Sequence, residues 1–189
     1  IMSKIVYRPL GSLDIQPVKL FTDRWIGANY YSEKEVQAIF EQSQKNGLNA
    51  SFLAFFENRL IGVRLTLAPG IWINDLKNIS PQLWKVSPEF VGYFKSLFVD
   101  AEFQGQGTGK TLSDLSTNVL MQMGAKAVLT HSWLESPENS SQIYLLRSGF
   151  REVAQHPNFW NHIDYLCTRC APKRCVCTGV EMLNYLGAV

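Results

Sequence analysis

The glycine-rich stretch from Gln104 to Gly109 has the residue types and the spacing of an anion-binding turn. It follows the apolar run Leu97-Phe98-Val99 and precedes Lys110, where the pattern predicts that a helix begins. Glycine can adopt a positive φ and, lacking Cβ, lets backbone amides approach a bulky ligand. At the start of a helix, unpaired N–H groups and the positive end of the helix dipole converge on one point. The stretch therefore predicts a cradle for a phosphate group.

The four cysteines of the chain form a second candidate site. Cys167, Cys170, Cys175 and Cys177 are spaced C-x2-C-x4-C-x-C, and the stretch 171–174 between the pairs has the composition of a turn. Such a turn would bring the thiols to one point, and four thiolates around one ion form a structural zinc site. An iron–sulfur cluster, two disulfides and four free thiols remain alternatives to a single zinc ion.

The spacing of the glycines separates three kinds of phosphate cradle. A P-loop has four residues between its first glycine and a Gly-Lys-Thr triplet, but Gly105 lies one residue too close to Gly109-Lys110-Thr111. A dinucleotide-binding turn has the pattern Gly-x-Gly-x-x-Gly and an acidic residue about 20 positions later. Here the glycines alternate, and the chain near position 130 is not acidic. Nucleotide hydrolysis and dinucleotide binding are therefore disfavoured.

The remaining pattern resembles the acetyl-CoA motif of the GNAT superfamily of N-acetyltransferases. In this sequence the motif is Gln104-x-x-Gly107-x-Gly109, directly after a strand that ends in Leu97-Phe98-Val99. Ser148-Gly149-Phe150 resembles the second landmark of that family. The resemblance implies transfer of an acetyl group from acetyl-CoA to a primary amine of a small molecule or a protein. A GNAT-shaped module that binds CoA or a partner protein without transfer is the alternative.

The resemblance also implies which residues hold the cofactor. The pantetheine arm would pair with the backbone of the strand before the turn, where two strands splay apart, and the pyrophosphate would sit in the cradle. The implied contacts are Leu97, Phe98, Val99, Gln104, Gly105, Gln106, Gly107, Thr108, Gly109 and Lys110.

Acetyl transfer to an amine needs a base for the amine, a donor for the oxyanion and an acid for the leaving thiolate. Relatives usually carry a carboxylate late in the strand before the turn, but residues 93–96 include none. His131 and Glu135 are the remaining candidates for the base, with a water relay as the alternative. Relatives often carry a tyrosine where this chain has Leu145, so its neighbour Tyr144 is the candidate acid unless the thiolate leaves unassisted.

The rest of the chain predicts the elements that position these residues. Strands are expected at 5–10, 51–56, 60–67, 97–99, 127–130, 152–153 and 161–167, and helices at 15–25, from 32 onward, at 112–123 and at 137–147. The irregular stretch 69–88 is expected to be a surface insertion with buried tryptophans or a lid. With the resemblance, this order predicts an α/β domain at 1–166 with a central mixed, mostly antiparallel twisted sheet flanked by helices. A Cys-rich extension at 167–189 would follow, packed on the same domain.

Composition limits the classes of partner. The 189 residues are 46% hydrophobic, as in a globular protein, and the formal net charge is only +2. We expect no nucleic-acid partner because no block of Lys or Arg occurs, and no membrane partner because no apolar run reaches the length of a bilayer span. Without a secretory apolar segment near the first residues, a cytoplasmic monomer or homodimer is expected.

Overall fold

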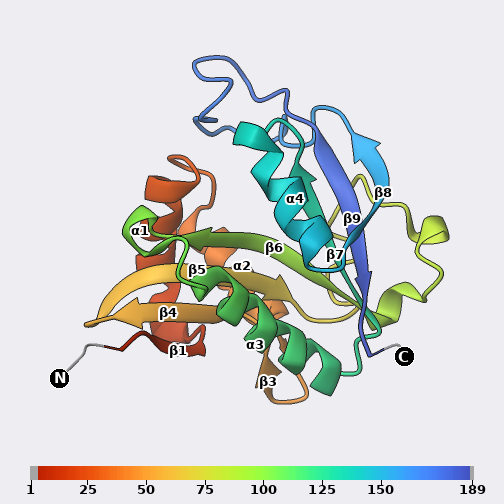
Figure 1. The fold of residues 1–189 in the computed structure, drawn as a ribbon, viewed down its shortest axis with the longest axis horizontal. Helices are drawn as coiled ribbons and strands as arrows, with labels where there is room; N and C mark the ends of the chain where they lie inside the picture. The colour runs from red at the N-terminus through yellow and green to blue at the C-terminus, as the bar shows by residue number, and fades with distance from the viewer. Residues whose placement is uncertain (1–3, 188–189) are drawn as a thin grey trace.

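The computed structural model describes residues 4–187, which form one seven-stranded sheet with helices on both faces (Figure 1). The strands are β1 (Val6–Pro9), β4 (Phe52–Phe56), β5 (Arg59–Leu67), β6 (Val91–Val99), β7 (Ala127–Trp133), β8 (Arg151–His156) and β9 (Gly179–Tyr185), with a small hairpin of β2 (Gln44–Lys45) and β3 (Leu48–Asn49). The helices are α1 (Ile15–Trp25), α2 (Glu33–Gln42), α3 (Thr108–Gln122) and α4 (Ser140–Arg147), and short 3-10 turns occupy Ser12–Asp14, Pro81–Leu83, Pro88–Phe90, Ala101–Phe103 and Pro137–Asn139.

The sheet is mixed and mostly antiparallel, as the sequence predicted. Its strand order is β1-β4-β5-β6-β7-β9-β8, and every neighbouring pair is antiparallel except β6 and β7. These two parallel strands are connected through α3, as parallel neighbours require a crossover. The opening strand β1 pairs with β4, which in turn pairs with β5.

The parallel pair comes apart halfway along its length. Pairing between β6 and β7 runs from Val91 opposite Ala127 to Phe94 opposite Thr130 and then stops, although both strands continue. Beyond that point the two halves of the sheet diverge, β1-β4-β5-β6 on one side and β7-β9-β8 on the other (Figure 1). The sheet therefore opens a wedge at the carboxyl end of β6, where the glycine-rich turn begins.

Successive side chains of a strand pack against helices on opposite faces of the sheet. Leu53 and Ala54 are neighbours on β4 and therefore point to opposite faces. Leu53 packs in the core that contains α1 and α2, whereas Ala54 packs with Leu112 of α3. Local signals mark the ends of two helices: Ser32 and Glu35 form a capping box at the start of α2, and Gly124 follows α3 with a φ of 88°.

The irregular stretch 69–88 contributes to the core. Trp72 and Trp84 are both fully buried, and their ring centroids lie 6.0 Å apart. Their indole N–H groups donate to Val91 O at 2.9 Å and to Glu181 Oε1 at 2.7 Å. The stretch is thus an insertion anchored by buried tryptophans rather than a lid.

The predicted strand at 161–167 is wrong. Residues 160–163 form a turn instead, in which Ile163 N donates to Trp160 O at 3.0 Å. The strand that pairs with both β7 and β8 is β9, at Gly179–Tyr185, within the segment that the sequence assigned to the Cys-rich extension. Residues 179–183 are all buried, as a central strand requires, whereas most of 161–166 is exposed. The cysteines therefore lie in a loop between β8 and β9, residues 157–178, which we name the cysteine loop.

No helix among the described residues combines the length and the apolar character that crossing a bilayer needs.

Candidate functional site

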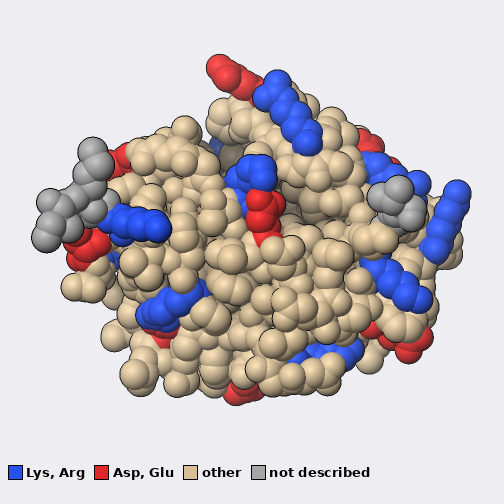
Figure 2. All heavy atoms as spheres, turned by 60° about the horizontal axis from the view of Figure 1, so that its bottom comes forward, with Lys and Arg blue, Asp and Glu red and all other residues tan. Residues whose placement is uncertain are grey.

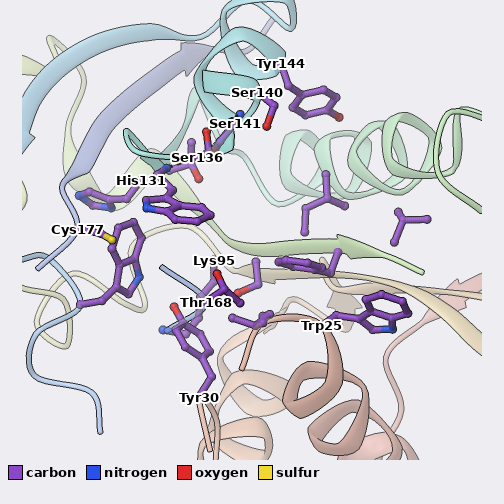
Figure 3. A pocket seen from close by; sticks show the side chains of 18 of the residues that line it. Trp25, Tyr30, Lys95, His131, Ser136, Ser140, Ser141, Tyr144, Thr168 and Cys177 are labelled. Atoms are coloured by element: carbon purple, nitrogen blue, oxygen red, sulfur yellow. Dashed lines mark hydrogen bonds between the residues drawn. The ribbon is translucent and has the colours of Figure 1, made fainter. Parts of the chain in front are cut away.

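A cavity of about 690 Å³ fills the wedge between β6 and β7. Its walls come from β6 after Phe94, from β7, from α4, from the chain at 25–30 that follows α1, and from the cysteine loop. Figure 3 shows Tyr144 extending from α4 on one side, with Tyr30 and Lys95 on the opposite wall. Segments that are distant in the sequence therefore meet around one space of the size expected for a ligand site.

The predicted cradle begins at Gln104, which lines the cavity, and continues into the start of α3. Gly105 and Gly107 have φ values of 75° and 82°, and a Cβ on either would meet no atom within 4 Å. The open space explains how a ligand could reach the backbone, and the left-handed conformation explains why glycine is needed. The first backbone bond at this helix start runs from Thr111 N to Gly107 O at 2.9 Å, so the three preceding N–H groups have no partner within the helix.

An orphaned hydroxyl in the cradle also fits a ligand. Thr108 Oγ1 is buried and has no hydrogen-bond partner among the described residues. Such groups are rare in native proteins unless something else pairs with them. An open turn, unpaired amides and an orphaned hydroxyl together fit a phosphate-bearing cofactor such as acetyl-CoA.

The strand before the cradle has an edge without a strand neighbour. Beyond Phe94, β6 pairs only with β5, and a bulge at Lys95 shifts the register between the two strands. Gln104 reaches back along this edge and donates from Nε2 to Val99 O at 2.9 Å. A Cβ on Gly109 would lie 3.6 Å from Leu97, so Leu97 packs against the helix while its backbone borders the cavity. Phe98 also lines the cavity.

Two predicted cradle side chains make local contacts instead of facing the cavity. Lys110 Nζ lies 2.5 Å from the Asp114 carboxylate on an exposed helix face. Gln106 Nε2 donates to Glu102 O at 3.3 Å. A ligand in the cradle would therefore meet backbone groups, and these side chains could move toward it only by giving up their local partners.

His131 lines the cavity, but both of its ring nitrogens are already occupied. Nδ1 lies 2.8 Å from the Tyr93 hydroxyl, and Nε2 lies 3.0 Å from Asn78 O, which can only accept. Nε2 therefore carries the proton and Nδ1 accepts from Tyr93. Burial lowers the pKa of His131 to about 4, and its ring stacks on Phe159 at 4.2 Å. Both ring nitrogens of His131 therefore make hydrogen bonds within the protein.

The other two candidates occupy different positions. Both carboxylate oxygens of Glu135 accept from Thr178 N, at 2.9 and 3.0 Å, so Glu135 fastens the end of the cysteine loop to the end of β7. Glu135 is not one of the residues that line the cavity in the described part of the chain. Tyr144 does line it, whereas its neighbour Leu145 is largely buried in the core. Of the three candidates, His131 and Tyr144 line the cavity, and both ring nitrogens of His131 are already hydrogen-bonded.

Two cations in the cavity wall were missed by the sequence analysis. Arg64 of β5 is 4% exposed, stacks over the Phe94 ring at 4.0 Å and donates to Ser113 Oγ. Burial lowers its pKa to about 10. Lys95 projects from the bulge of β6, and burial lowers its pKa as well. A charged residue inside each of two apolar strands was the available signal, because such residues are seldom buried without a function.

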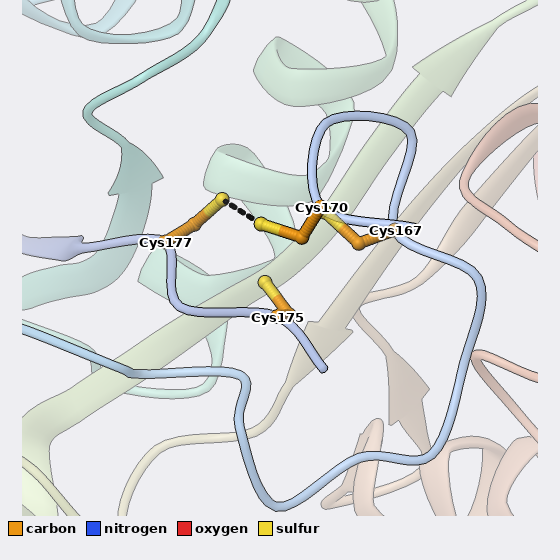
Figure 4. Close-up of side chains that lie close together, drawn as sticks. All are labelled: Cys167, Cys170, Cys175 and Cys177. Carbon is orange, nitrogen blue, oxygen red and sulfur yellow. Dashed lines mark hydrogen bonds between the residues drawn. The ribbon is translucent and has the colours of Figure 1, made fainter. Parts of the chain in front are cut away.

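The four cysteines lie close together (Figure 4), and two of them, Cys167 and Cys177, line the cavity. Their Sγ atoms all lie within 4.8 Å of one another, and Cys170 and Cys177 are 3.6 Å apart. All four are free thiols. Burial opposes ionisation of Cys167, but the N–H groups of Arg169 and Cys170 lower its pKa to about 7. The arrangement can hold a soft metal ion.

The distribution of charged side chains differs between the outer surface and the cavity wall. On the face drawn in Figure 2, Lys and Arg groups are interspersed with Asp and Glu among uncharged side chains. In contrast, the cavity is lined by Arg64 and Lys95 and, within the described residues, by no carboxylate. The Lys and Arg side chains that line the described cavity are thus not balanced by lining carboxylates, whereas the outer surface carries both signs of charge.

Comparison with protein families gives one match over most of the chain. Residues 18–150 match the family described as Acetyltransferase (GNAT) family. None of the curated proteins matches the sequence significantly.

Solved structures share the whole fold at low sequence identity. The ribosomal-protein-S18-alanine N-acetyltransferase from Escherichia coli is 15% identical, with a TM-score of 0.67 over 98% of this chain and 96% of that one. Ard1 from Thermoplasma volcanium is 14% identical, with a TM-score of 0.65 over 96% and 97%. Arabidopsis thaliana Naa50, solved with the bisubstrate analogue CoA-Ac-MVNAL, is 13% identical, with a TM-score of 0.63 over 95% and 97%. At these identities the likeness concerns the fold.

Proposed function

The chain belongs to the GNAT acetyltransferase family, and from this premise we propose that it transfers an acetyl group from acetyl-CoA to a primary amine. The observation that carries the proposal is the continuity of the phosphate cradle with the free edge of β6 and with a cavity beyond it. The cradle would take the pyrophosphate, the edge from Lys95 to Val99 would pair with the pantetheine arm, and the acetyl group would reach the cavity. The open turn and the orphaned Thr108 hydroxyl support this assignment.

The proposed proton transfers use Tyr144 and water. Tyr144 would protonate the departing thiolate, since its side chain lines the cavity. Water would take the proton of the amine, because both nitrogens of His131 are engaged. His131 and Glu135 would act as positioning residues: the first holds the cavity wall, and the second holds the cysteine loop.

The charge of the cavity bears on the acceptor. An amine attacks only in its neutral form, and a nearby cation lowers the pKa of a bound ammonium. Lys95 would therefore favour the reactive amine and would attract an acceptor that carries a carboxylate or another anionic group. We propose an amine acceptor of that kind, either a small molecule or the terminus of a peptide.

A second candidate function is a GNAT-shaped module that binds CoA without transfer. The lack of a carboxylate in the described cavity wall favours it, since relatives' usual base is missing. Incubation with acetyl-CoA and a panel of amino acids, polyamines and short peptides, followed by mass spectrometry, distinguishes the two. Acetylated product supports transfer, and tight binding without product from any amine supports the module.

We also propose that Cys167, Cys170, Cys175 and Cys177 hold one structural zinc ion. The convergence of their sulfur atoms supports the presence of a metal ion. The role of the ion would be structural, because a site with four thiolate ligands is closed and leaves no position for a substrate. Four neighbouring thiols stay reduced most readily in the cytoplasm, where we place the protein.

A further inference from the structure

The separations of the four sulfur atoms match a tetrahedral site. With Zn–S bonds of about 2.3 Å, tetrahedral geometry places neighbouring sulfurs about 3.8 Å apart. The 3.6 Å between Cys170 and Cys177 is close to this value, and all other pairs lie within 4.8 Å. A disulfide would need about 2.05 Å. The thiols therefore surround a space of the size of a zinc ion.

Hydrogen-bond donors lie beside the sulfur atoms of the cluster. Backbone N–H groups of Arg169 and Cys170 point at Cys167, and the Arg169 guanidinium lies 4.0 Å from Cys177 Sγ. The indole of Trp133 lies beside Cys177, and its buried N–H has no hydrogen-bond partner among the described residues. Donors that converge on sulfur stabilise thiolates, the form that binds metal.

The cluster is also a wall of the cavity. Cys167, Thr168 and Cys177 line it directly. Trp133 and Trp160 pack against the cysteines and line the cavity as well. The cysteine loop thus closes the end of the wedge that lies away from the cradle.

The same loop reaches across the cavity to the segment after α1. Tyr165 donates its hydroxyl to Cys175 Sγ at 3.5 Å and packs edge-on against Tyr30, with ring centroids 5.0 Å apart. The backbones approach closely beside this contact, because a Cβ on Gly27 would lie 2.7 Å from Leu166 O. A route of direct contacts therefore leads from the cluster to the opposite wall.

From these contacts we infer that the zinc centre builds the acceptor end of the cavity, so that zinc occupancy controls acceptor binding without affecting acetyl-CoA binding. Without the ion, four unconnected thiols would not fix residues 167–177, which otherwise have only turns and side-chain contacts. The contact of Tyr165 with Tyr30 would then loosen, and the acceptor wall with it. The inference rests on the proposed acetyl transfer in one respect: the cavity end beside the cysteine loop is taken to bind the acceptor amine.

Metal analysis tests the site itself. The full chain, purified without chelator, should contain about one zinc per chain, and Cys175→Ser should lose it. Lys173→Ala is the matched control, because Lys173 is exposed in the turn between the cysteine pairs and offers no thiol. Since Cys175→Ser could fail to fold, cobalt substitution of the unmodified chain provides a second reading: a tetrathiolate site gives strong visible absorption with sulfur-to-cobalt charge transfer. A metal-free chain with four titratable thiols, or a chain that contains an iron–sulfur cluster, would overturn the inference.

Hydrogen exchange tests the wall and needs no acceptor. Removal of zinc with a chelator should speed exchange in 157–178 and in 26–31, on the opposite wall, and should leave 104–110 unchanged. Calorimetric affinity for acetyl-CoA should stay the same. Faster exchange confined to 167–177, or a parallel loss of acetyl-CoA affinity, would overturn the inference. If neither the zinc-loaded nor the zinc-free chain bound acetyl-CoA, the proposed function would fail while the metal result stood.

Discussion

The two ends of the cavity are built in different ways. The cradle end is one continuous stretch from β6 to the start of α3, and it offers backbone amides that are open to solvent. The acceptor end is assembled from the segment after α1, from β6 and β7, and from the cysteine loop, and it offers aromatic side chains, sulfur and one lysine. Backbone recognition depends on conformation, whereas side-chain recognition depends on packing between distant segments. Changes at the two ends should therefore have separable effects, on acetyl-CoA affinity and on use of the acceptor.

The largest expected effect belongs to the cradle. Gly107→Val should weaken acetyl-CoA binding by at least roughly 100-fold, about 2.7 kcal/mol, because a β-branched residue resists a φ of 82° and fills the open turn. Calorimetry measures this. Gly47→Val is the matched control: Gly47 has a φ of 74° with open space around it, but lies in the β2–β3 hairpin. Equal acetyl-CoA affinities of a folded Gly107→Val variant and this control would show that the cradle does not bind acetyl-CoA.

In the α4 wall of the cavity, Tyr144→Phe should lower kcat roughly tenfold, a modest loss for an acid because a thiolate leaves readily. Affinity for acetyl-CoA should not change. Tyr7→Phe, on the edge strand β1, is the control for loss of a tyrosine hydroxyl. Steady-state kinetics with an accepted amine separate the two parameters, and an unchanged kcat would mean that the thiolate leaves without this residue.

Lys95 tests the proposed charge of the acceptor. Lys95→Met should raise KM for an anionic amine acceptor several-fold, on the order of one kcal/mol, whereas Lys95→Arg should retain most of the affinity. Acetyl-CoA affinity should be the same in both variants. A KM that rises equally for uncharged and anionic amines would assign Lys95 to packing alone.

A separate effect concerns stability rather than binding, namely the acid stability of the acceptor wall. Burial lowers the pKa of His131 to about 4, so between the ordinary value of 6.5 and 4 the unfolded chain binds a proton that the folded chain does not. The contribution of His131 is therefore fully present above pH 6.5 and is lost as the pH falls to 4, by on the order of 3 kcal/mol. Glu181, His156 and Lys95 modulate the value.

Urea unfolding at several pH values measures this dependence. His131→Gln should flatten the fall in the free energy of unfolding, whereas His162→Gln, at an exposed position, should leave it unchanged. The same slope in all three proteins would show that His131 is not buried in its neutral form.

The two ends also differ in how far the sequence predicts them. The turn conformation of the cradle was predictable because the positive φ of Gly105 and Gly107 is a local backbone property that sequence spacing encodes directly. Lys95 and Arg64 were missed because their role depends on which face of the strand meets the cavity. The last strand was misplaced because Glu181 interrupts the apolar pattern of β9. Only the fold brings His156 within 2.8 Å of its carboxylate and the Trp84 indole within 2.7 Å.

The central claim is that one cavity binds acetyl-CoA at the cradle and passes its acetyl group to an amine at the other end. The most direct test is a single-turnover reaction of the protein, loaded with acetyl-CoA, with each amine of the panel, followed by mass spectrometry. The account predicts free CoA and an acetylated amine in equal amounts for at least one anionic acceptor, and neither product with Gly107→Val. Acetyl-CoA that binds at the cradle and stays intact with every amine would contradict it.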